Sequence, residues 1–197
     1  MSDRIHALLD LWFGNVGSAD LPSSDRTDLW FGEKNTFKKE MLDVFKEEYQ
    51  QAIQGELSDW EKTPRGRLAL IILFDQFSRV MYAESAESFA HDAKAQALCL
   101  EGLKAQMDQS LTLIERVFFY MPLVHAEEVE LQEQSILLYE TLVALSLSET
   151  TQIYQLFLAY AYAHFKVIKT FGRFPQRNVI LNRPSTEAEL DFLKRAR

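Results

Sequence analysis

The sequence predicts an all-α fold in which roughly eight helices pack as antiparallel hairpins. Apolar residues recur along most of the chain at the three- and four-residue spacing of amphipathic helices, and little alternating strand pattern lies between them. Only 7 glycines and 5 prolines occur in 197 residues, which favours long helices joined by few turns. The length and the even composition predict one domain, residues 1–197.

Helix start and stop signals place the individual segments. Thr63 and Pro64 form a typical N-cap and first helical position, and the residues after them are apolar on nearly every side through Phe74. That pattern predicts a central buried helix, followed by an irregular connection over residues 78–90. The other expected elements are helices over residues 2–13, 35–53, 90–103, 112–122, 126–145, 146–171 and from 186 onward, and a loop over 13–32 that ends in a short helical turn.

Three capping boxes, each a Ser or Thr followed three residues later by Glu, support these helix starts. We expect the helix from residue 112 to stop at Pro122, because proline lacks a backbone N–H. Gly172 is expected to cap the helix that ends at Phe171. The boxes pair Thr112 with Glu115, Ser146 with Glu149, and Thr186 with Glu189.

The charge, the hydropathy and the cysteine content exclude several classes of function and partner. The formal net charge of -8 and the pI near 5.1 argue against nucleic-acid binding, which needs a basic face. The longest apolar run, residues 68–74, is too short to span a bilayer, and the N-terminal segment lacks the pattern of a signal peptide. We therefore expect a cytoplasmic protein without a membrane partner. The single cysteine, Cys99, excludes an intrachain disulfide and lies in an apolar helical pattern, so it is expected to be a small buried side chain.

Several polar residues fall where the helical pattern predicts a core. Asp75 follows the apolar run of the central helix, and an acid at a helix C-terminus opposes the helix dipole. It therefore needs a partner, which Arg79 could supply four residues later. The pair is either a structural ion pair or a carboxylate held ready for a ligand. Gln132 lies on the apolar stripe of the helix over residues 126–145, where a buried amide needs hydrogen-bond partners.

Two histidines have similarly open interpretations. His164 lies on the apolar stripe of the long helix, either as a core histidine bonded to a backbone carbonyl or as a ligand contact. His125 follows Pro122 in the gap between two helices, a favourable place for chemistry. With Glu127 it could form an acid–base pair or supply two metal ligands.

The segment "FGRFPQRN" places two arginines in a stiff loop after the long helix. No acid occurs between Thr150 and Thr186, while Arg173 and Arg177 flank a Phe-Pro pair that restricts the backbone. The two guanidinium groups could clamp the acids described above, or bind a carboxylate or phosphate.

Five segments together resemble the domain of unknown function 924 family, a group of uncharacterised bacterial proteins. The resemblance implies an all-α fold of antiparallel helical hairpins in a single tetratricopeptide-like superhelical domain, and it implies no activity. The segments are "LDLWFG", "RLALIILFDQFSR", "FAHDAKAQAL", "ERVFFYMPLVHAEE" and "FGRFPQRNVILNRPSTEAE". The family's recurrent polar positions fall on Asp75, Gln76, Arg79, Glu115, Arg116, His125, Glu127, Gln132, His164, Arg173, Arg177 and Asn178.

The chain departs from the family pattern at three positions. Ser78 stands where the family has proline, Ala126 where it has serine, and Gln176 where it often has histidine. Because Gln176 removes a third histidine, and the remaining histidines lack close ligand spacing, we expect no metal or other cofactor.

These observations leave three hypotheses. The favoured one is a small-molecule site for an anionic group, which is either a binding site alone or an enzyme. The alternatives are a tetratricopeptide-like scaffold for a peptide or protein partner, and a sealed ion-pair network that fixes helix register. The acid–base candidates are Asp75, His125, Glu127 and His164. The candidate ligand-binding residues are Arg79, Arg116, Gln132, Arg173, Arg177 and Asn178.

Overall fold

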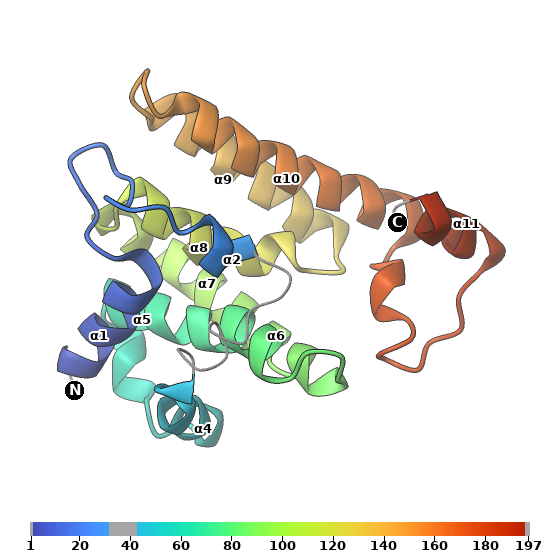
Figure 1. The fold of residues 1–197 in the computed structure, drawn as a ribbon, viewed down its shortest axis with the longest axis horizontal. Coiled ribbons are helices and arrows are strands. Elements are labelled where there is room, and N and C mark those ends of the chain that lie inside the picture. Colours follow the sequence, from blue (N-terminus) through green and yellow to red (C-terminus); the bar gives the residue numbers. More distant parts are fainter. Residues whose placement is uncertain (1, 32–42, 196–197) are drawn as a thin grey trace.

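The computed structural model describes residues 2–31 and 43–195, and it confirms the all-α prediction (Figure 1). Within these residues extended pairing is limited to one isolated bridge between Val16 and Pro22. The α-helices are α1 (Ser2–Phe13), α2 (Thr27–Phe31), α4 (Lys46–Gln54), α5 (Pro64–Ile71), α6 (Ser78–Met81), α7 (Asp92–Lys104), α8 (Leu113–Val124), α9 (Val129–Leu145), α10 (Thr151–Phe171) and α11 (Glu187–Arg195). Short 3-10 helices cover Ser58–Lys62, Ala86–Phe89, Met107–Ser110 and Pro175–Arg177. The start of the helix expected over 35–53 lies outside the described residues.

The central helix is longer than the sequence predicts. It begins at α5, where the Thr63 hydroxyl accepts a hydrogen bond from the Gly66 amide, and it passes through a π-helical segment, Ile72–Phe77, into α6. The irregular connection expected from residue 78 is therefore wrong for its first turn. The Ser78 hydroxyl donates to the carbonyl of Phe74 at 2.6 Å, so Ser78 is accommodated within the helix.

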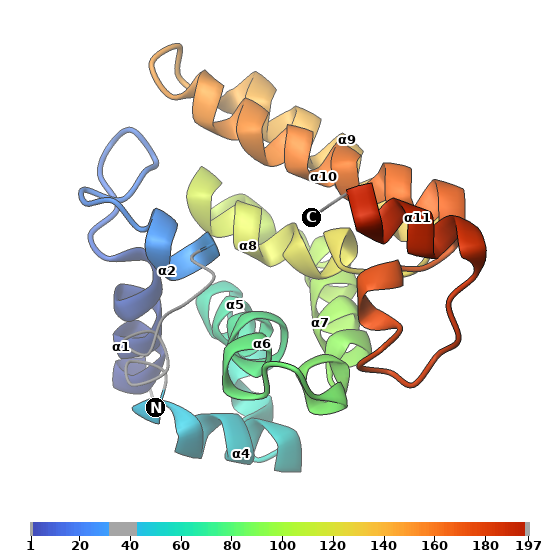
Figure 2. The same ribbon diagram turned by 45° about the vertical axis from the view of Figure 1, so that its right-hand side comes forward.

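Helix α8 fills the centre of the molecule between α5 and the α9–α10 pair (Figure 2). It is buried over nearly its whole length and does not stop at Pro122, as the sequence predicts, but continues to Val124. Proline removes only one backbone donor here, close to the helix end, and the fully buried Leu123 and Val124 hold the last turn in the core. His125 is the residue that caps this helix.

Helices α9 and α10 form an antiparallel hairpin along one side of the molecule (Figure 1). Gly172 adopts the left-handed conformation and caps α10, as predicted. The capping box expected at Ser146 is wrong: α10 begins at Thr151, because the Ser146 hydroxyl donates to the carbonyl of Val143 instead. The other two boxes, those of Thr112 and Thr186, are present.

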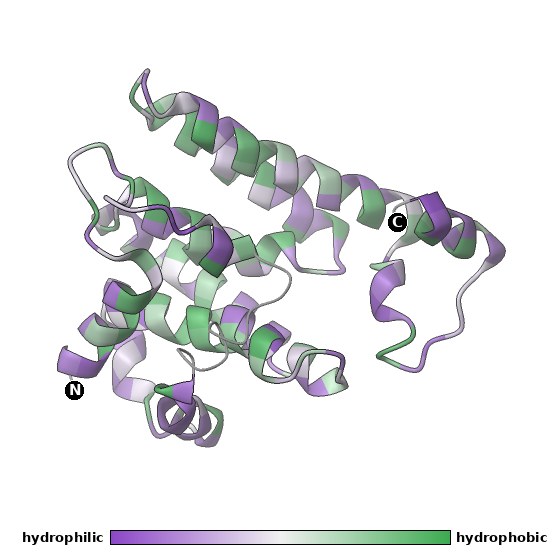
Figure 3. Ribbon diagram, viewed as in Figure 1, coloured by the Kyte–Doolittle hydropathy of each residue, from purple (hydrophilic) through white to green (hydrophobic). Residues whose placement is uncertain are grey.

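An aromatic cluster joins the N-terminal segment to α8. The ring of Phe118 lies 5.5 Å from those of Trp12 and Phe13 and 4.9 Å from that of Trp30, measured between centroids. Hydrophilic residues dominate the peripheral α4 (Figure 3). None of the helices in the described part of the chain is long and apolar enough to cross a membrane. The tetratricopeptide-like stacking stays a prediction.

Candidate functional site

The π-helical segment positions Asp75 at the centre of a polar cluster. Its carboxylate is only 1% exposed and accepts a hydrogen bond from the Gln76 amide at 2.6 Å. His125 Nδ1 lies 2.8 and 2.9 Å from its two oxygens, and the Arg79 guanidinium lies 3.3 Å away. The prediction that Asp75 is buried and paired with an arginine is confirmed. π-Helical turns are rare and often occur at functional sites.

A second acid completes the cluster. Asp92, at the start of α7, lies 3.0 Å from Arg79 and 3.3 Å from Arg177. Arg177 also donates to the backbone carbonyl of His125 at 3.0 Å. Its guanidinium carbon lies 4.6 Å from the ring centroids of both Phe89 and Phe174, so it is held between two aromatic faces. Two carboxylates and two guanidinium groups therefore balance each other.

This balance decides the protonation state of the Asp75–His125 pair. Burial opposes ionisation of Asp75, but the charge of Arg79 and the contact with His125 hold the pKa of its carboxyl below the usual range. Burial lowers the pKa of His125, and the attraction of Asp75 only partly offsets it because Arg79 repels a second positive charge. His125 is therefore neutral at neutral pH and donates its Nδ1 proton to Asp75, which leaves Nε2 as the acceptor.

His164 lies beside His125 on α10, with 6.0 Å between the ring centroids. Its Nδ1 donates to the backbone carbonyl of Tyr160 at 2.9 Å, as expected for a core histidine. Its ring packs 4.1 Å from that of Tyr160 and 5.4 Å from that of Phe174. Burial lowers the pKa of His164, so its Nε2 is also a proton acceptor at neutral pH.

Glu127 does not belong to this acid–base arrangement. It accepts the backbone N–H of Phe174 at 2.8 Å and contacts both terminal nitrogens of Arg183 at 2.5 and 3.0 Å. The acid–base pair of Glu127 with His125, one of the two possibilities raised by the sequence, is not among the contacts of either side chain. Its carboxylate instead ties the turn after α8 to the C-terminal segment, which Arg183 reaches after a left-handed turn at Asn182.

The two arginines of "FGRFPQRN" point in different directions. Arg177 faces the His125 loop and joins the polar cluster, whereas Arg173, which was also expected as a possible clamp for the acids of the cluster, does not reach them. Arg173 contacts the Glu189 carboxylate at 2.6 and 2.9 Å and the carbonyl of Pro184 at 2.8 Å. Glu189 lies in the first turn of α11 and attracts Arg173 away from the cluster.

The remaining candidate residues bond mainly to nearby backbone or to C-terminal side chains. Arg116 donates to the carbonyls of Gln109 and Leu111, outside the cluster. The fully buried Gln132 donates to the carbonyls of Val124 and Ala126 and so fixes the turn that carries His125. Asn178 is buried as well. It donates to Ser185 and accepts from Arg183.

The sequence patterns do not predict the roles of Asp92 and Arg183. Asp92 fits the ordinary preference for an acid at a helix start, which hides its ion pairs with Arg79 and Arg177. Arg183 pairs with a carboxylate 56 residues away, so no local signal could reveal it. Within residues 2–31 and 43–195, no three His, Cys, Asp or Glu side chains are arranged to hold a metal ion.

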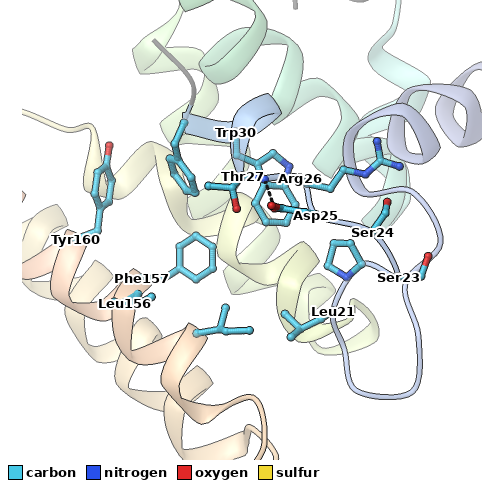
Figure 4. A pocket seen from close by; sticks show the side chains of 13 residues that line it. Leu21, Ser23, Ser24, Asp25, Arg26, Thr27, Trp30, Leu156, Phe157 and Tyr160 are labelled. Carbon is cyan, nitrogen blue, oxygen red and sulfur yellow. Dashed lines mark hydrogen bonds between the residues drawn. The ribbon is translucent and has the colours of Figure 1, made fainter.

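Two hollows lie near the polar cluster, one ending at Tyr160 and the other lined by His164. The larger, about 530 Å³, lies between α10, α2 and the loop before α2 (Figure 4). Tyr160 forms one of its walls. The smaller, about 220 Å³, lies between α10, α11 and the loop that follows α10, and it is lined in part by His164, Phe174 and Gln176.

Comparison with known proteins places the chain in a family. The family model described as "Bacterial protein of unknown function (DUF924)" matches residues 8–197. The chain belongs to this family. A solved structure, the protein of unknown function ATU0120 from Agrobacterium tumefaciens, is 28% identical and superposes with a TM-score of 0.80 over 98% of each chain. No curated protein matches the chain. Because neither the DUF924 description nor the solved structure carries an activity, function is argued from the site.

The buried histidines should make stability sensitive to mild acid. Their pKa values are lowered in the folded protein, so the unfolded chain binds protons at higher pH. The stability gained by keeping them neutral is fully present above about pH 6.5 and is lost as the pH falls below it. We expect the urea-derived free energy of unfolding to decrease from about pH 7 to about pH 5.5, before most carboxylates titrate.

Replacement of the histidines tests the cause of this pH dependence. The double variant His125→Gln/His164→Gln should show a shallower slope over the same range, whatever its absolute stability. His91, whose pKa is also lowered by burial, should supply part of the residual slope. An unchanged slope in the double variant would show that other groups cause the pH dependence.

Proposed function

We propose that the Asp75–His125 pair is the acid–base centre of a site that acts on a small molecule. The contact between the buried Asp75 carboxylate and His125 Nδ1, at 2.8 Å, carries the proposal. A carboxylate in this position fixes the tautomer and orientation of the imidazole and stabilises the imidazolium that forms on proton uptake. His125 Nε2 would then take a proton from water or from the substrate, an effect that typically contributes 10²- to 10⁴-fold.

The surroundings of the pair support a catalytic role over a purely structural one. A structural ion pair needs only Asp75 and Arg79, whereas this cluster adds two neutral histidines whose Nδ1 atoms are both anchored. Gln132 and Arg177 hold the backbone on either side of His125, at Val124, at Ala126 and at His125 itself. Such support keeps a reacting side chain in one geometry.

The charge balance favours an uncharged substrate over the anionic ligand expected from the sequence. Arg79 and Arg177 already face Asp75 and Asp92, and Arg173 faces Glu189. An anion would have to compete with these carboxylates for each guanidinium. The tetratricopeptide-like peptide scaffold stays an alternative hypothesis, with no contact in the polar cluster that favours it.

The reactivity of His125 toward diethyl pyrocarbonate tests the proposal, because this reagent acylates accessible neutral imidazoles. Mass mapping of the folded protein resolves each of the 4 histidines. We expect His125 to react in the folded protein, more slowly than the exposed His6, and Asp75→Asn to slow that rate further. If His125 reacts only after denaturation, while exposed His6 reacts in the folded protein, the cluster is sealed and the proposal is wrong.

A further inference from the structure

We propose that the hollow of about 530 Å³ binds the apolar body of the substrate, an uncharged amphipathic molecule with an aromatic or short aliphatic part. Its polar end would extend past Tyr160 toward His164 and His125. The inference rests on the acid–base site proposed above and adds the substrate class and the direction from which it approaches.

The walls of the hollow are those of a small-molecule site. Its volume falls within the roughly 300–1,000 Å³ typical of ligand pockets. Apolar side chains converge on it from α2, α10 and the loop before α2, and the side formed by that loop also carries hydroxyl groups and two residues of opposite charge, Asp25 and Arg26 (Figure 4). They include Leu21, Trp30, Phe31, Ile153, Leu156 and Phe157. Among these, Phe31, Ile153 and Leu156 are exposed, and covering them with a ligand would remove apolar area from water.

Tyr160 connects this hollow to the acid–base centre. Phe157, Tyr160 and His164 follow one another at intervals of three and four residues on α10, so they share one face of the helix. The Tyr160 ring lines the hollow, and its centroid lies 4.1 Å from that of the His164 ring. The centroid of the His164 ring in turn lies 6.0 Å from that of His125. The hollow ends at Tyr160, and neither histidine lines it, so the polar end of a molecule seated against Phe157 would have to pass the Tyr160 ring to reach the two histidines along this face.

The charges near this path indicate an uncharged polar end. Burial raises the pKa of Tyr160; the charge of Asp75 acts in the same direction, and the charges of Arg79 and Arg177 oppose it. Because opposite charges act together at this point, neither an anion nor a cation gains a net attraction. A carbonyl, amide or hydroxyl can exchange hydrogen bonds with Tyr160 and the histidine Nε2 atoms without the desolvation cost of an ion.

Binding of prodan, an uncharged naphthalene dye that emits at shorter wavelength in apolar surroundings, tests the hollow directly. We expect saturable binding to the wild-type chain, weakened about ten-fold or more in Leu156→Glu, because a carboxylate at the wall must be desolvated against the dye. Leu137→Glu is the matched control: Leu137 lies on α9 away from the hollow and is 64% exposed, against 67% for Leu156. The control should bind as the wild type does.

Two further measurements separate this inference from the proposed function. Saturating prodan should slow pyrocarbonate modification of His125 in the wild type. Anilinonaphthalene sulfonate, an anionic dye of similar shape, should bind more weakly than prodan. Absence of saturable prodan binding, an equal affinity in Leu156→Glu, or tighter binding of the anionic dye would overturn the inference. Prodan binding that leaves His125 modification unchanged would also overturn it, while the reactivity of His125 alone decides the acid–base proposal.

Discussion

Replacement of Asp75 by alanine should lower the free energy of unfolding by roughly 3 to 5 kcal/mol, the range for removing one partner of a buried ion pair. Asp75 is 1% exposed, and its loss would leave the Arg79 guanidinium with Asp92 as its remaining carboxylate. The Nδ1 proton of His125 would lose its acceptor in a buried environment. Urea unfolding at neutral pH, with the m-value checked against the wild type, measures the change.

Asp59→Ala is the matched control for this variant. Asp59 pairs with Lys62 at 2.6 Å on the surface, three residues apart, with both side chains largely exposed. Surface pairs contribute little, so this substitution should leave the unfolding midpoint nearly unchanged. Equal, small effects of the two substitutions would mean that Asp75 is solvated and that the polar cluster does not exist as described.

Phe118→Ala should be comparably damaging, with a loss of roughly 3 to 5 kcal/mol for a large buried aromatic side chain. Phe118 is fully buried, and its ring contacts Trp12, Phe13 and Trp30. The cavity would remove the main aromatic support of Trp30, so α2 should loosen and prodan affinity should fall as well. Urea unfolding and dye titration measure the two effects.

Phe171→Ala provides the comparison for Phe118. The Phe171 ring lies at the end of α10, is only partly buried, and packs 5.2 Å from that of Phe192. Its truncation leaves a site that water can fill, so the loss of stability should be much smaller. Similar losses for the two variants would contradict the assignment of Phe118 to the centre of the core.

Local signals in the sequence were sufficient to predict most helix boundaries, but they were insufficient to predict most side-chain pairings. The boxes at Thr112 and Thr186 formed because a Glu three residues later can reach back to the N-cap in any helix. Ser146 has the same pattern, yet its hydroxyl bonds to Val143, a competing local acceptor supplied by the preceding helix. Pro122 was tolerated because packing around the last turn of α8 outweighs one missing donor.

In the polar cluster, too, contacts between residues close in the sequence were predictable and contacts between distant residues were not. The Asp75–Arg79 pair was predictable because both residues lie one turn apart on one helix. The Asp75–His125 contact joins residues 50 apart, and a π-helical turn, which no simple periodicity reveals, sets the direction of Asp75. Arg177 and Arg173 share one short loop, and only the position of α11 explains why Arg173 turns toward Glu189.

The sequence separation between the paired residues of the polar cluster has a consequence for the order of folding. The contacts of Asp75 close within 50 residues, whereas Asp92 meets Arg177 across 85 residues. Closing the longer loop costs somewhat more chain entropy, so we expect the Asp92–Arg177 contact to form after the Asp75–His125 contact. On the ribosome, the Asp75–His125 pair can assemble while the C-terminal part of the chain is still inside the exit tunnel. The ion pair between Arg177 and Asp92 then forms last. Until it forms, Arg79 is the one guanidinium partner of Asp92 in the cluster.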